Sequence, residues 1–76
     1  MNEEIIKTKL IKNIQDITNN KSISIDSTQE NSQGWDSLAY MSIVTMVEKE
    51  FRIPISYENI RKFNSVKSIL DILKNV

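Results

Sequence analysis

The sequence predicts an all-α fold, a small four-helix bundle with three longer helices and one short helix. Apolar residues recur at helical spacing in three stretches of the chain. Residues that commonly begin and end helices flank these stretches. The length of 76 residues suits one domain, residues 1–76, with a single small core.

The first predicted helix covers residues 3–18. Its apolar residues lie three or four positions apart, which is typical of an amphipathic helix. Asn2 can cap its start, and Asn19 and Asn20 tolerate the left-handed conformation that often ends a helix. The apolar stripe consists of Ile6, Leu10, Ile14 and Ile17, and Ile5 and Ile11 widen it.

A polar segment, from Thr18 to Asp36, separates this helix from the next. It is rich in Ser, Asn, Gln and Thr, and no regular element is predicted there. Irregular loops longer than about 12–15 residues are uncommon in compact domains and are usually functional, disordered or linkers. We expect Ile23 and Ile25 to hold this loop against the core, each contributing up to about 1.5–3 kcal/mol if fully buried.

The second long helix is predicted over residues 36–51, with an apolar stripe that faces the core. Pro54 lacks a backbone N–H and disfavours a helical residue before it, so the helix should end near Phe51 or Arg52. The residues of the stripe, at spacings of three and four, are Leu38, Met41, Val44, Val47 and Phe51.

Two more helices are predicted in the last third of the chain. A short one follows Ser56, with Ile60 and Phe63 one turn apart and expected in the core. The final helix begins after Ser65 as its cap. Its apolar residues are Val66, Ile69, Leu70, Leu73 and Val76.

The composition excludes several classes of function. The chain has no Cys and no His, which removes disulfides, thiolate and imidazole nucleophiles, and the usual zinc ligands. No paired catalytic groups can be located, so we expect a protein that is not an enzyme. Zero net charge and a pI near 6.2 argue against a nucleic-acid-binding module. The N-terminus resembles neither a signal peptide nor a membrane span, so we expect a cytoplasmic protein. We also expect a monomer.

The start of the second long helix is the candidate functional site. Gly34, the only glycine, indicates a turn that needs positive φ. Asp36 is a good N-cap and makes Ser37 the first helical residue, where free backbone N–H groups and the helix dipole favour an attached anion. The alternative is purely structural: Asp36 is only a cap, and Trp35 and Tyr40 form a hydrophobic staple.

At these residues the sequence resembles a known family. The stretch GWDSL, residues 34–38, is similar to the carrier-serine motif of acyl carrier proteins and peptidyl carrier domains. The stretch VEKEFRIPIS, residues 47–56, is similar to the Glu-rich end of the family's second helix. The order of helices and the Ser65-Val66 start of the last helix extend the resemblance over the whole chain.

The resemblance implies that Ser37 is the attachment residue for 4′-phosphopantetheine, transferred from coenzyme A by a separate magnesium-dependent phosphopantetheinyl transferase. Asp36 would support this modification. Acyl or aminoacyl intermediates would travel as thioesters between a loading ligase and a downstream transferase or synthase. The GWDSL spelling looks more like discrete carriers of specialised pathways, such as secondary-metabolite or surface-glycan synthesis, than like the housekeeping fatty acid carrier.

The resemblance also implies a partner-binding face on the second helix. Partner enzymes of the family read acidic residues along this helix, and Asp36 and Glu48 stand at such positions. Leu38 would be the apolar contact beside the arm. These acids belong to residues 19–51, which carry a net charge of −3 and are interpreted either as an acidic patch or as an ordinary solvated face.

The match on this face is partial. Ala39, Ser42 and Lys49 occupy places where fatty acid carriers usually have acids, so electrostatic steering should be weaker. Ser42 and Met46 are further candidate partner contacts, on a face predicted to turn away from the core together with Ala39. Met46 is interpreted either as a contact or as a merely exposed methionine.

Two further hypotheses concern other functions and the cargo. The chain could be an unmodified interaction domain of the carrier fold, which phosphopantetheinylation would test, whereas a nucleic-acid-binding module is disfavoured by the missing basic stripe. Family resemblance places Ile60 and Phe63 near the cavity that shelters fatty acyl chains. Because both residues are bulky, we expect long chains to be sheltered poorly and short or polar groups to be favoured.

Overall fold

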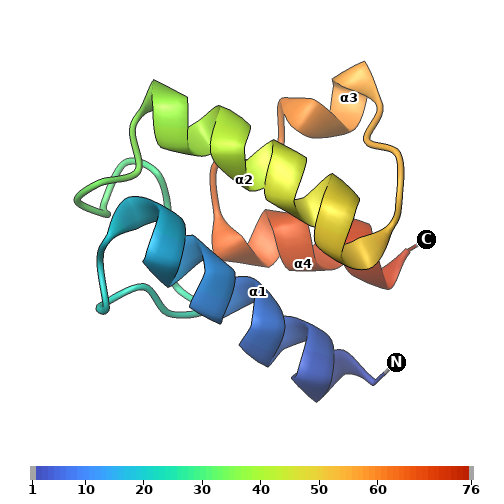
Figure 1. Cartoon of the computed structure of the whole chain (residues 1–76), viewed down its shortest axis with the longest axis horizontal. Coiled ribbons are helices and arrows are strands. Elements are labelled where there is room, and N and C mark those ends of the chain that lie inside the picture. Colours follow the sequence, from blue (N-terminus) through green and yellow to red (C-terminus); the bar gives the residue numbers. More distant parts are fainter. Residues whose placement is uncertain (1, 76) are drawn as a thin grey trace.

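The computed structural model describes residues 2–75 and contains four helices (Figure 1). These are α1 (Glu3–Thr18), α2 (Ser37–Phe51), α3 (Tyr57–Ile60) and α4 (Val66–Lys74). The described part of the chain has no strand and only one isolated bridge, between Thr28 and Ser65. The predicted small all-α bundle is therefore confirmed.

The predicted helix starts are all present, and each depends on one polar side chain. Asn2 accepts a hydrogen bond from the N–H of Ile5, and Asp36, Ser56 and Ser65 accept equivalent bonds at α2, α3 and α4. Such caps satisfy N–H groups that have no partner within the helix.

The helix ends agree with the sequence except at the last helix. Asn19 ends α1 in the left-handed conformation, with φ of 52°, and Arg52 ends α2 in the same way, with φ of 54°. Helix α4 ends at Lys74, with Asn75 as its cap, and the predicted last apolar position, Val76, lies outside the described residues.

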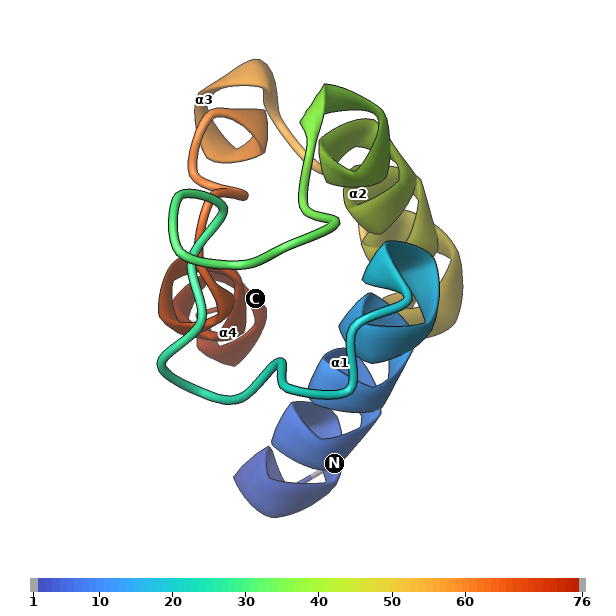
Figure 2. The ribbon, with the colours of Figure 1, turned by 90° about the vertical axis from the view of Figure 1, so that its left-hand side faces the viewer.

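The core lies between α1, α2 and α4, and segment 19–36 crosses one end of the bundle (Figure 2). Ile23 and Trp35 in this segment are buried, and Ile25 packs against the core, as expected for a loop held by its few apolar residues. The backbone of residues 27–29 also bonds to residues 64–66. The buried core residues are Leu10, Ile14, Ile23, Trp35, Ile43, Val44, Val47, Phe63, Val66, Ile69, Leu70, Ile72 and Leu73.

The predicted core stripe of α2 is wrong at its first two positions. The side chain of Leu38 is 79% exposed and that of Met41 is 50% exposed. A step of three residues along a helix turns by about 300°, which is short of a full turn. A stripe built from such steps therefore winds around α2, and Leu38 lies about 180° around the helix from the buried Val47. The core side of α2 consists of Ala39, Ile43, Val44 and Val47.

The opposite face of α2 was also predicted incorrectly in part. Ala39 is buried, and Met46 is half-buried and packs against the core, although both were expected to turn away from it. Ser42 is exposed as predicted. Around the axis of α2, Ala39 lies about 100° from the exposed Leu38. This position puts Ala39 on the buried face of the helix, together with Ile43 and Val47.

Helix α3 is held against α2 by the hydroxyl of Tyr40. This hydroxyl donates to the carbonyl oxygen of Ile60 and accepts from the N–H of Phe63 at 3.1 Å. Phe63 is fully buried and Ile60 packs against the core, so their predicted core role is confirmed. Among residues 2–75, no helix combines the length and the apolar character that crossing a membrane requires.

Candidate functional site at the start of α2

Ser37 is the first residue of α2, and its side chain is exposed to solvent together with that of Asp36. The Asp36 carboxylate accepts a hydrogen bond from the N–H of Ala39 at 2.8 Å, and the Asp36 carbonyl accepts from the N–H of Tyr40 at 2.9 Å. Within residues 2–75 the N–H groups of Ser37 and Leu38 find no acceptor. The cap and the first helical residue are therefore as predicted, and two backbone donors remain free beside the serine.

Gly34 and Trp35 fix the chain that leads into this helix. Gly34 has φ of 88°, as predicted for this position. A Cβ added to it would lie 2.2 Å from the carbonyl oxygen of Thr18, the last residue of α1. Trp35 is only 3% exposed and belongs to the core, although its Nε1 donates no hydrogen bond. The site is thus held by a close backbone contact on one side of Trp35 and by the Asp36 cap on the other.

The acidic charge of the middle segment is partly neutralised in the fold. Of the five acids in residues 19–51, Asp26 lies 2.9 Å from the ammonium of Lys67 and Glu50 lies 3.6 Å from that of Lys9. Exposed pairs of this kind contribute about 0–1 kcal/mol to stability, but they reduce the field that a charged partner meets.

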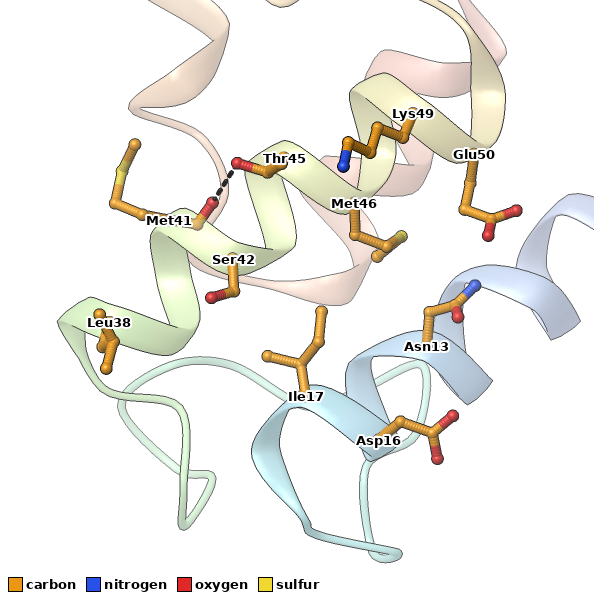
Figure 3. Close-up of a pocket in the computed structure, with 10 residues that line it drawn as sticks. All are labelled: Asn13, Asp16, Ile17, Leu38, Met41, Ser42, Thr45, Met46, Lys49 and Glu50. Carbon is orange, nitrogen blue, oxygen red and sulfur yellow. Dashed lines mark hydrogen bonds between the residues drawn. The ribbon is translucent and has the colours of Figure 1, made fainter.

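Three of the four predicted partner-contact residues come together in one groove between α1 and α2 (Figure 3). This α1/α2 groove has a volume of about 560 Å³, and Leu38, Ser42 and Met46 line it. Glu48 does not line it: its carboxylate accepts a hydrogen bond from the N–H of Ile55 at 3.3 Å, in the connection to α3. Glu48 therefore has a local structural contact in addition to any role toward partners.

The groove also contains residues that were not predicted as site residues. In Figure 3 the side chains of Met46 and Ile17 point toward each other across it, and Lys49 points back along α2. Correct placement of the exposed face of α2 would have found the lining residues of that helix, whereas the pairing of α2 with α1 has no local signal. The remaining lining residues are Asn13, Asp16, Met41, Thr45 and Glu50.

Comparison with known proteins adds no identification. No protein-family model matches the chain, and no curated protein matches it. The geometry at Ser37 and the resemblance of the sequence around it are therefore the grounds for assigning a function.

Proposed function

We propose that this chain is a carrier domain that holds acyl or aminoacyl intermediates on a 4′-phosphopantetheine arm attached to the Ser37 hydroxyl. The single observation that carries the proposal is the position of Ser37: exposed, first in α2, and directly after a capping aspartate. Its surroundings support attachment of a phosphodiester. The free N–H groups of Ser37 and Leu38 and the positive end of the helix dipole all favour a negative charge there.

The chain lacks the groups that would let it modify itself. It has no His and no Cys, and the side chain that caps this helix, Asp36, uses a carboxylate oxygen to accept from Ala39. We propose that an external transferase removes the hydroxyl proton. In this step the Ser37 oxygen forms a bond to the β-phosphorus of coenzyme A, the pyrophosphate P–O bond breaks, and adenosine 3′,5′-bisphosphate leaves with the electron pair.

The arm would supply a thiol, so that a chain without Cys could carry a thioester. The protein's own residues would contribute position rather than chemistry. Trp35 and Gly34 hold the entry to α2, and Asp36 fixes the first turn that presents Ser37. We further propose that a loading ligase and a downstream transferase or synthase act on the loaded carrier, in fatty acid-like or specialised biosynthesis.

A second candidate is an interaction domain that is never modified. The exposure of the apolar side chains of Leu38 and Met41 beside the α1/α2 groove favours this alternative, because such side chains often contact a partner. Both functions would use the same surface of α2, so only the modification of Ser37 separates them.

The test is an intact mass measurement after incubation with coenzyme A, magnesium and a broad-specificity phosphopantetheinyl transferase. The wild-type protein should gain one phosphopantetheine. Ser37→Ala should gain none. Ser22→Ala is the matched control. It removes the hydroxyl of a different exposed serine, one that lies outside the helices, and it should leave the gain in mass unchanged.

Two results would contradict the proposal. The first is a folded wild-type protein that gains no mass while the same transferase modifies a reference carrier in the same tube. The second is a gain that persists in Ser37→Ala, which would place the modification on another residue. The first result would favour the unmodified interaction domain.

A further inference from the structure

We propose that the α1/α2 groove is the resting site of the arm carried by Ser37, so that the arm lies along the outer side of α2 and outside the core. This inference rests on the proposed function. It assigns a binding role to residues of α1, chiefly Ile17 and Asn13, which the sequence did not connect with the site.

The groove begins beside the attachment residue and has a suitable length. Its first lining residue on α2 is Leu38, which follows Ser37 directly, and its last is Glu50. At a rise of about 1.5 Å per residue these two residues are about 18 Å apart along α2. An extended chain gains about 1.1–1.2 Å per covalent bond, so an arm of about fourteen bonds from the serine oxygen to the thiol reaches about 16 Å. The thiol would therefore lie within the groove, about 2 Å or more short of its far end.

The groove is lined by both apolar and polar side chains, and this mixture suits the chemistry of the arm. Ile17 and Met46 present apolar side chains to each other across the groove (Figure 3), and the arm has a geminal dimethyl group and short methylene segments. Asn13 and Ser42 are polar lining residues that can bond to its amides. Methionine adapts its shape easily, which suits a surface that releases its occupant when a partner binds.

The charges that line the groove do not oppose an anionic occupant, whereas Asp36, next to Ser37, has a carboxylate that forms no ion pair among residues 2–75. The two lining carboxylates are both paired with lysines of α1: Asp16 lies 2.9 Å from Lys12, and Glu50 lies 3.6 Å from Lys9. Lys49 also lines the groove and forms no ion pair among residues 2–75. A phosphodiester at the Ser37 end therefore meets no uncompensated lining carboxylate.

On the opposite side of α2, hydrogen bonds close the entry between α2 and α3. There the hydroxyl of Tyr40 joins α2 to the carbonyl of Ile60 and the N–H of Phe63, and the Phe63 ring is fully buried. An arm that entered between α2 and α3 would have to break both hydrogen bonds. This would remove both hydrogen bonds of the half-buried Tyr40 hydroxyl, which costs about 1–3 kcal/mol.

NMR of the modified protein tests this placement without any measurement of activity. The protein is labelled with ¹³C at Ile and Met methyl groups and modified with unlabelled coenzyme A. Isotope-filtered spectra should show contacts from the arm methyl groups to the methyl groups of Ile17 and Met46. The methyl group of Ile69, which is fully buried, should show no contact and no shift.

A variant that fills the groove provides the second measurement. Ser42→Trp should abolish the contacts at Ile17, measured only on protein whose intact mass shows that Ser37 carries the arm. Thr8→Trp is the matched control, because Thr8 is also a small exposed hydroxyl residue but lies about 180° around α1 from Ile17. It should keep the contacts.

The outcomes separate this inference from the proposed function. A wild-type protein that gains the arm but shows no contact to Ile17 or Met46 overturns the groove alone. Contacts to the methyl groups of Ile60 instead would place the arm between α2 and α3 and would also overturn it. Groove shifts that appear only when a partner enzyme is added would make the groove a docking site for that partner. A wild-type protein that gains no mass overturns both proposals.

Discussion

Gly34→Ala should destabilise the fold more than any other single-methyl change near the site. Two effects add at this position. An alanine at φ of 88° costs about 1–2 kcal/mol, and its Cβ would lie 2.2 Å from the Thr18 carbonyl oxygen, so the two backbone segments must separate. Overpacking of this kind costs about 1–3 kcal/mol. The free energy of unfolding should therefore fall by about 2–5 kcal/mol, out of about 4–11 kcal/mol expected for a chain of 76 residues.

Urea unfolding followed by Trp35 fluorescence measures this loss, because Trp35 is the only tryptophan and is buried. Asn19→Ala is the matched control. Asn19 also has positive φ, 52°, but it is exposed, so alanine there should cost only about 1–2 kcal/mol. If Gly34→Ala loses no more stability than Asn19→Ala, the close contact with Thr18 does not constrain the fold and the argument is wrong.

Substitutions at four further positions separate the roles of the α2 cap and of residues within α2. Asp36→Ala should lower the free energy of unfolding by about 0.5–2 kcal/mol through loss of the cap, and Asp36→Asn should restore most of it in the same urea titration. Tyr40→Phe should cost about 1–3 kcal/mol, because the two hydrogen bonds of the Tyr40 hydroxyl to Ile60 and Phe63 are lost; an unchanged free energy of unfolding in the same urea titration would exclude this clamp. Leu38→Ala should change thermal stability by less than about 0.5 kcal/mol, whereas Ile43→Ala should cost about 2–5 kcal/mol, and similar losses would mean that Leu38 is buried.

The elements of the candidate site could be predicted because their signals are local. Gly34, Asp36 and Ser37 are neighbours in the sequence, and their roles as turn, cap and first helical residue depend on backbone geometry over a few positions. The same is true of Ser56 and Ser65 as caps.

The groove beside the site could not be predicted in the same way. Its floor needs Ile17 from α1 and Met46 from α2, which are separated by the whole polar loop. Nothing in either helix alone specifies that these two residues face each other. The incorrect prediction of the core stripe of α2 also hid the groove, because it placed Leu38 in the core and Ala39 on the surface, the reverse of what the structure shows.

The sequence by itself determined where helices begin and where α1 and α2 end, because capping side chains, Pro54 and the single glycine act on their immediate neighbours. It also determined that any thiol chemistry must come from outside a chain without Cys. Only the tertiary structure decided which face of α2 is buried, since α2 carries apolar residues around most of its circumference and its helix partners select among them. The α1/α2 groove results from that selection: burial of Ile43 and Val47 turns Leu38 and Ser42 outward beside α1.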